Sequence, residues 1–157
     1  MTIASTMSDI HPPASIARLD ALRMRARRFP LPLLEFGMRL AVGATFFKSG
    51  MNKFQSFDTA VLLFQEEYRL PLLPPEIAAY MGTTVELAAP VLLVLGLWAR
   101  FGAAALLVMT LTIQFLVYPA NWSEHLMWAS ILAYVLTRGP GALSIDRLIA
   151  FRLFGRV

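Results

Sequence analysis

The chain has 157 residues, of which 57% are hydrophobic and 15% charged, and its mean hydropathy is +0.61. A soluble domain of this length cannot hide so much apolar surface from water, so the composition predicts an integral membrane protein. The net charge of +4 reflects basic residues on one side of the predicted membrane spans and does not indicate nucleic-acid binding. The absence of cysteine excludes disulfides, iron–sulfur clusters and thiolate metal sites.

The N-terminal region is predicted to be a tail followed by a basic helix, together covering residues 1–29. Residues 1–14 are polar and lack periodicity, which predicts disorder, and no apolar signal-peptide core precedes the basic stretch. From residue 15 to 29, apolar residues alternate with arginines at helical spacing. This pattern is typical of an amphipathic helix that lies on the inner leaflet, although a helix that docks a partner is the alternative. Pro30 and Pro32 then separate it from the first span.

Four apolar stretches follow, at residues 31–47, 77–98, 101–118 and 126–137. A bilayer core requires about 17–25 apolar residues per spanning helix, and the first three stretches meet that length. The fourth reaches it when residues 122–138 are counted. We therefore predict an all-α fold, a four-transmembrane-helix bundle over residues 30–138.

Charged residues predict the orientation of the bundle. One side of the four spans carries Arg18, Arg23, Arg25, Arg27, Arg28, Arg100, Arg138, Arg147, Arg152 and Arg156. The other side carries only Lys48, Lys53 and Arg69. Because basic residues in short loops stay in the cytoplasm, both termini are predicted to be cytoplasmic, close to anionic lipid.

Two connecting segments are long enough to hold further helices. In the outer loop, residues 49–76, Asp58 is a plausible N-cap for a helix that ends before Pro71. That helix is expected to lie on the outer surface or to cover a cavity between the spans. At the other end, Gly139-Pro140-Gly141 ends the fourth span, and residues 139–157 are predicted to form a basic amphipathic C-terminal segment.

The sequence predicts no redox centre of its own, no metal site and no catalytic residue. Its two histidines, His11 and His125, lie in the tail and at the outer end of the fourth span, where they cannot make a haem-binding pair. The methionines are scattered as in a hydrophobic core. No nucleotide-binding, serine-hydrolase or zinc-protease motif occurs.

Charged residues inside the first two spans are the candidates for function, because such groups are costly in a bilayer. Glu35 and Arg39 are one helical turn apart and can satisfy each other. Glu86 lies about 13 Å from the outer end of its span, near the midplane. It either forms a structural pair with Arg39 or is a carboxyl that binds or relays protons for a polar substrate, such as a quinone head group.

A second polar cluster is predicted at the outer ends of the spans. It contains Lys48, Lys53, Gln114, Trp122, Glu124, His125 and Trp128. The tryptophans fit an ordinary aromatic belt, Gln114 fits a plain interhelical hydrogen bond, and His125 fits an inert interfacial residue. Alternatively, Lys48, Glu86, Gln114 and His125 line one pocket that opens toward the periplasm and the lipid.

Four strings in this order resemble the DoxX family of small bacterial membrane proteins over residues 33–148: FFKSGMNKF, ELAAPVLLVLGLWARFGA, IQFLVYPANWSEHLMWA and RGPGALSIDRL. The resemblance implies a four-helix bundle in the bacterial inner membrane with both termini in the cytoplasm. It also implies a link to quinol oxidase and to thiosulfate-dependent quinone reduction, whereas other relatives assist oxidative-stress or metal-handling systems. The motif positions that carry over are Arg39, Gly50, Lys53, Glu86, Pro90, Gly96, Gln114, Pro119, Trp122, His125 and Trp128.

The leading hypothesis is a non-catalytic inner-membrane subunit that supports quinone-linked redox chemistry while a partner supplies the electrons. Arg39 would hold Glu86, Glu86 and His125 would handle protons, and Gln114 and Lys48 would donate to a carbonyl oxygen. The predicted ligand-binding residues are Arg39, Lys48, Lys53, Glu86, Gln114, Trp122 and His125. The alternative is an assembly, docking or small-solute transport component, whose buried charges only fix helix register. Small residues in the spans also permit a homo-oligomer.

Overall fold

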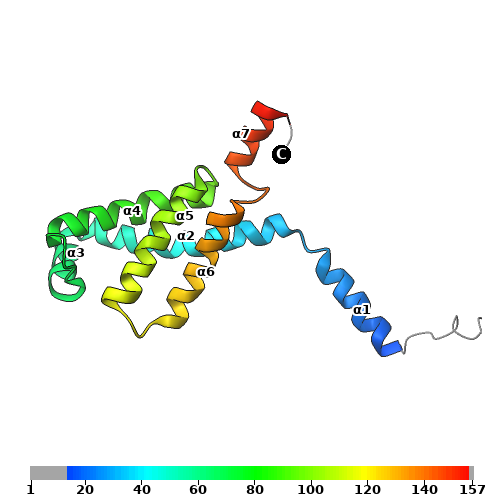
Figure 1. Cartoon of the computed structure of the whole chain (residues 1–157), viewed down its shortest axis with the longest axis horizontal. Helices are drawn as coiled ribbons and strands as arrows, with labels where there is room; N and C mark the ends of the chain where they lie inside the picture. The colour runs from blue at the N-terminus through cyan, green and yellow to red at the C-terminus, as the bar shows by residue number, and fades with distance from the viewer. Residues whose placement is uncertain (1–13, 156–157) are drawn as a thin grey trace, which may run out of the picture. The chain divides into compact units, whose positions relative to one another are not determined.

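The computed structural model describes residues 14–155, which form helices and connecting turns with no strand among them (Figure 1). The chain divides into two compact units, Met1–Leu31 and Pro32–Val157. The disorder predicted for residues 1–14 falls outside the described residues, except that Ala14 begins the first helix.

Helix α1 (Ala14–Arg27) confirms the helix predicted before the first span. Its amphipathic character was predicted wrongly, since apolar and basic side chains are spread around the helix and not gathered on opposite faces. The reason is the spacing, because Ile16, Leu19, Leu22 and Met24 do not keep to one stripe at 3.6 residues per turn.

Four long helices build the second unit around a shared core. They are α2 (Leu31–Gln55), α4 (Pro75–Leu95), α5 (Ala99–Thr112), which continues into the π-helical turn η2 (Ile113–Val117), and α6 (Trp122–Arg138). Helix α5 packs against both α4 and α6, and α2 runs beside α4 (Figure 1). The buried core draws Val42 and Phe46 from α2, Leu93 from α4, Leu106 from α5 and Leu132 from α6.

Two of these helices are long and apolar enough to cross a membrane, namely α4 with 21 residues and α5 with η2, together 19 residues. Only 39% and 28% of their apolar stretches are buried by the rest of the protein. Helices in a soluble core would be mostly buried, so the exposed apolar surface indicates a lipid environment. Helix α2 carries four charged residues and α6 has 17 residues, so neither meets the same criterion.

The outer loop contains the predicted helix, formed by α3 (Phe57–Leu63) and a second π-helical turn, η1 (Phe64–Tyr68). Ser56 occupies the N-cap position, which corrects the prediction of Asp58, a residue of the first turn. Phe64 packs with Ala78 and Ala79 of α4 in a small separate core. This contact holds the loop against the outer end of α4.

Helix α7 (Ile145–Phe154) begins after the N-cap Ser144 and lies at the end of the unit where α4 ends and α5 begins. The carboxylate of Asp146 accepts hydrogen bonds from the backbone N–H groups of Trp98 and Ala99, at 2.9 and 3.2 Å. These donors belong to the N-cap and the first residue of α5, where no intrahelical acceptor is available. Gly96 ends α4 with φ of +66°, and a Cβ there would overlap Ser144. The hydrogen bonds of Asp146 and the packing of Ser144 on Gly96 therefore hold the start of α7 against the turn between α4 and α5.

Candidate functional site

A buried ion pair joins α2 to α4. The Lys53 ammonium donates to both carboxylate oxygens of Glu86, at 2.8 and 2.7 Å, and to the Ser49 hydroxyl at 2.8 Å. The side chains of Lys53 and Glu86 are only 9% and 6% exposed. The helices approach closely here because Gly50 has no side chain, and a Cβ on it would lie 2.9 Å from the Cβ of Glu86. The predicted pairing of Glu86 with Arg39 is therefore wrong.

Arg39 has a structural role at the other end of α4. It is fully buried, and its Nη1 donates to the carbonyls of Leu93 and Val94 at 3.0 and 2.8 Å, while Nη2 donates to the carbonyl of Leu143. Leu93 and Val94 both lie in the last turn of α4, where carbonyls have few intrahelical donors, and the Leu93 carbonyl also accepts from the Gly96 N–H at 3.2 Å. Arg39 cannot reach Glu86 as well, because Glu86 lies seven residues before Leu93, about 10 Å along the axis.

Glu35 also has a different partner from the one predicted. Its Oε1 accepts a hydrogen bond from the hydroxyl of Tyr134 at 2.9 Å. No ion pair joins it to Arg39 among residues 14–155. Arg39 instead turns toward the end of α4, with its guanidinium 5.5 Å from the Phe36 ring centre.

A second polar network connects α6 to η2. Nδ1 of His125 lies 2.6 Å from Oε1 of Gln114, and Nε2 of Gln114 donates to the carbonyl of Pro119 at 2.9 Å. A carbonyl can only accept, so the amide nitrogen must face Pro119 and the amide oxygen must face the imidazole. The network therefore assigns the proton to Nδ1, and in the neutral imidazole Nε2 is an acceptor. The interhelical hydrogen bond predicted for Gln114 is confirmed.

The two networks border a common polar cavity of about 170 Å³. Its walls come from α2, η1, α4, η2, α6 and the turn before α6. The polar side chains that line it belong to Thr45, Ser49, Tyr68, Glu86, Tyr118, Asn121, Glu124, His125 and Trp128. Glu86 and His125 are its most buried polar members, each 4% exposed.

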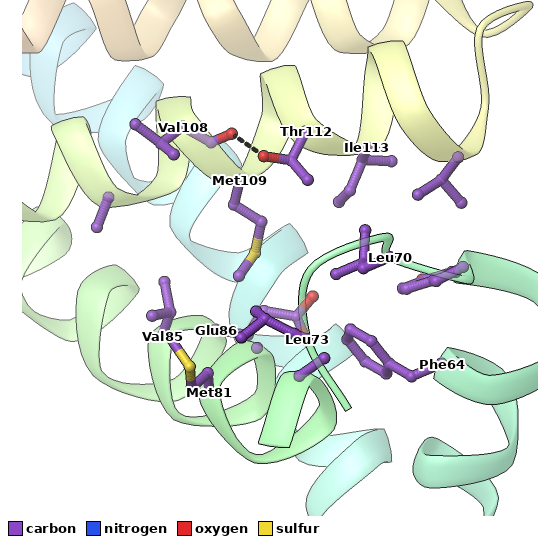
Figure 2. Close-up of a pocket in the computed structure, with 15 residues that line it drawn as sticks. Phe64, Leu70, Leu73, Met81, Val85, Glu86, Val108, Met109, Thr112 and Ile113 are labelled. Carbon is purple, nitrogen blue, oxygen red and sulfur yellow. Dashed lines mark hydrogen bonds between the residues drawn. The ribbon is translucent and has the colours of Figure 1, made fainter. Parts of the chain in front are cut away.

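An apolar cavity of about 300 Å³ lies next to the polar one, between α4, α5 and the outer loop. Figure 2 shows Met109 of α5 and Phe64 of η1 pointing into this space, with the Glu86 side chain at its edge. The two cavities share Tyr68, Glu86 and Ile113 as lining residues. The Glu86 carboxylate therefore lies where the apolar cavity and the polar cavity meet.

The apolar cavity opens at the outer surface of α4 and α5. Met81 and Val108 line it, and they are 52% and 65% exposed. Both belong to the helices that are long enough to cross a membrane. The apolar cavity is therefore lined in part by exposed apolar side chains of the two helices that could cross a membrane.

The seven predicted ligand-binding residues separate into three groups. Glu86 and His125 line the polar cavity, and Lys53 and Gln114 are buried directly behind them, each holding one of the two. Lys48 and Trp122 are exposed and line neither cavity, and Trp122 packs edge-on against Phe115. Arg39, described above, lies at the opposite end of α4.

Several residues of the polar cavity were missed by sequence reasoning, among them Ser49, Tyr68 and Tyr118. Ser49 precedes Lys53 by one helical turn, and this spacing was a usable signal for a shared face. Tyr68 and Tyr118 come from separate turns, and their rings meet edge-to-face at 6.1 Å. Only the folded chain brings these two together, so no local pattern could have identified them.

Tyr118 also fastens the outer loop to the end of η2. Its hydroxyl donates to the carboxylate of Glu67, a residue of η1. Burial and this hydrogen bond raise the pKa of Tyr118 above its ordinary value. Burial, followed by the charges of Glu86 and Glu67, likewise raises the pKa of Tyr68. Both phenols are therefore neutral donors at physiological pH.

Within residues 14–155, no group of three or more histidine, aspartate or glutamate side chains is placed to hold a metal ion. The polar cavity instead presents one carboxylate, one imidazole and several hydroxyls. Such groups can form hydrogen bonds to a small polar head group and can exchange protons with it.

One of three comparisons with known proteins supports the resemblance to the DoxX family. The other two, with the curated proteins and with the solved structures, gave no match. The DoxX family model matches residues 34–119, which is more than half of the chain. The match begins in α2 and ends at Pro119, so it includes the Lys53–Glu86 pair and Gln114 but not α6. The chain is a membrane protein that belongs to the DoxX family.

Proposed function

We propose that this protein is a non-catalytic subunit of the bacterial inner membrane that binds a quinone-type ligand and supports redox chemistry carried out by a partner. The observation that carries the proposal is the pair of adjacent cavities, one polar and one apolar, that meet at Glu86. A quinone has the same two parts, a ring with polar oxygens and an apolar tail.

The proposed arrangement has four spans with both termini in the cytoplasm. It is supported by the packing of α2 and α6 against α4 and α5, the two helices long and apolar enough to span. It is also supported by burial, since Arg39 and Lys53, two of the four charged residues of α2, point into the protein and not toward lipid. The arginines of the termini and of the turn between α4 and α5 then share one side.

The dimensions and chemistry of the cavities fit this ligand class. A volume of about 300 Å³ is at the lower end for ligand pockets, and it suits a ring or the first units of a tail. In the polar cavity, Glu86 and His125 would accept hydrogen bonds from the head group and exchange protons with it. The partner would supply the electrons.

The proposal is tested by native mass spectrometry on the full chain extracted with its own lipids. We expect a retained molecule of the quinone class in the wild type. Ala105→Phe, which fills the apolar cavity, should lose it, whereas Val91→Phe, on the exposed face of α4 outside that cavity, should keep it. A wild-type protein that carries only phospholipid would overturn the proposal.

A second candidate function is the docking or assembly of a membrane complex, or a role in small-solute transport within it. Exposed apolar side chains on the outer loop favour docking, since Leu62 is 57% exposed and Leu72 is 90% exposed. If docking is the function, with no redox ligand involved, Leu62→Ser combined with Leu72→Ser should abolish co-purification of a partner.

A further inference from the structure

The polar cavity has lost most of its hydrogen-bond donors to contacts within the protein. The three protons of the Lys53 ammonium are directed to the Ser49 hydroxyl and to the two oxygens of Glu86. The Ser49 hydroxyl in turn donates to Glu86 at 3.3 Å. Neither group retains a proton for a ligand.

Three further donors near the cavity, on Gln114, Thr45 and Tyr118, also form hydrogen bonds within the protein. The Gln114 amide nitrogen donates to the carbonyl of Pro119. The Thr45 hydroxyl donates to the carbonyl of Ala41, one turn earlier, and the Tyr118 hydroxyl donates to Glu67. The donors that sequence reasoning assigned to a ligand carbonyl, Gln114 and Lys48, are therefore either occupied or outside the cavity.

The two most buried polar groups of the cavity, Glu86 and His125, can still accept a hydrogen bond. An ionised carboxylate offers about four lone-pair positions, and three of those on Glu86 are occupied by Lys53 and Ser49. The Nε2 of His125 has no hydrogen bond to any described residue, yet it is not among the buried side-chain atoms that are sealed off without a partner. Both groups belong to the cavity lining.

Free donors lie nearer the surface. The Trp128 indole makes no hydrogen bond to the described residues, and its side chain is half-buried, while the Asn121 side chain is exposed. The buried part of the cavity, formed by Glu86 and His125 and called its floor here, therefore accepts hydrogen bonds. Its more exposed part, the rim with Trp128 and Asn121, can donate them.

We infer that the site selects a head group with a hydroxyl that donates to its floor, and hence the hydroquinone form of a membrane-soluble quinone over the oxidised form. This inference rests on the proposed function, because it specifies the state of the ligand named there. The hydroxyl would donate to Glu86 or to Nε2 of His125, and the tail would lie in the apolar cavity beside Met109. A quinone carbonyl facing the same floor would leave both acceptors without a donor.

The test compares three ligands of nearly the same shape by isothermal titration calorimetry on the full wild-type chain in detergent. They are decylubiquinol, decylubiquinone and the dimethyl ether of decylubiquinol, which keeps both oxygens but cannot donate. The quinol is kept reduced by excess dithionite, which the cysteine-free protein tolerates without loss of disulfides. We expect the quinol to bind at least about tenfold more tightly than either of the others, the effect of one hydrogen bond to a charged group.

Equal or tighter binding of the quinone or the ether would overturn the inference while leaving the proposed function in place. Failure of all three ligands to bind would overturn the proposed function itself. A double variant, Lys53→Met with Glu86→Gln, removes the charge and places an amide donor at the floor. In that variant the preference for the quinol should shrink, and an unchanged preference would contradict the role given to Glu86.

Discussion

Lys53 and Glu86 neutralise each other at a buried position, where an unpaired charge is costly. Their contact connects the outer end of α2 to the middle of α4, beside Pro90, which lacks the N–H that would bond to the Glu86 carbonyl. A buried charge that loses its partner is far less stable than the pair, whereas replacing both charges with neutral groups is often tolerated.

This reasoning predicts a non-additive pair of substitutions. Lys53→Met should lower the free energy of unfolding by about 3–5 kcal/mol, and adding Glu86→Gln should restore much of the loss. Glu66→Gln is the control, since Glu66 and Arg69 form an ion pair whose side chains are 67% and 72% exposed, and its loss should matter by about 1 kcal/mol or less. Thermal unfolding in detergent measures all four proteins. Equal losses in the single and double variants would contradict the pairing.

Arg39 is predicted to be irreplaceable by lysine. Three carbonyl groups on two segments receive hydrogen bonds from its planar guanidinium. A lysine presents a single compact ammonium on a flexible stem, so Arg39→Lys should lower the melting temperature markedly. Ligand affinity should stay unchanged, because Arg39 lines neither cavity. Loss of affinity at full stability would show that Arg39 belongs to the binding site.

At the scale of elements, the outer loop is held over the cavities by the contact between Tyr118 and Glu67. A raised pKa in the folded protein means that this contribution to stability is present below pH about 10 and is lost as pH rises through the folded value. We therefore expect that Tyr118→Phe leaves the phenolate absorbance unchanged at pH about 10 and reduces it only at higher pH. A reduction already at pH 10 would show that the hydroxyl does not donate to Glu67.

The hydrogen bonds between Asp146 of α7 and the start of α5 lead to a second prediction about the helices. Asp146→Ala removes the acceptor for two backbone N–H groups and should lower the free energy of unfolding by about 0.5–2 kcal/mol. Asp146→Asn, which keeps one side-chain oxygen, should lose less. Amide hydrogen exchange at Trp98 and Ala99 should accelerate in the same order. Exchange that is unchanged in both variants would exclude the cap.

The helices themselves were largely predictable from the sequence, because apolar runs, prolines and glycines are local signals. Helix α6 spans the predicted residues 122–138, and α4 begins at Pro75, two residues before the predicted stretch. Helix α2 extends to Gln55, eight residues beyond the predicted apolar stretch, because its last two turns bury Gly50 and Lys53 against α4. Burial against a neighbouring helix is not visible in hydropathy.

The contacts between the site residues were less predictable than the identity of those residues. Glu86, Gln114 and His125 stand out in sequence because they are polar in apolar surroundings. Their contacts depend on how far each helix is rotated, and the π-helical turn η2 alters the rotation of the residues around Gln114. Such turns leave no reliable mark in a single sequence. Arg39 was paired with the wrong carboxylates because its contacts likewise depend on the rotation of α2 against α4.

For the molecule as a whole, the proposed topology can be tested on a chain that has no cysteine of its own. Ser123→Cys lies at the outer end of α6 and Arg147→Cys lies in α7, and both positions are exposed. In intact cells, a membrane-impermeant maleimide should label Ser123→Cys once the outer membrane is opened, and should label Arg147→Cys only after lysis. The reverse pattern would place the termini outside.

The most direct measurement of ligand binding uses the three tryptophans, because a quinone quenches the fluorescence of an indole close to it. Trp128 lines the polar cavity, whereas Trp98 is 68% exposed in the turn between α4 and α5. Two variants each keep one of them: Trp98→Phe with Trp122→Phe, and Trp122→Phe with Trp128→Phe. We predict that decylubiquinone quenches Trp128 with a saturable dependence on concentration and quenches Trp98 only in proportion to its concentration in the detergent. The same unsaturable quenching of both tryptophans would show that the cavities do not bind a quinone.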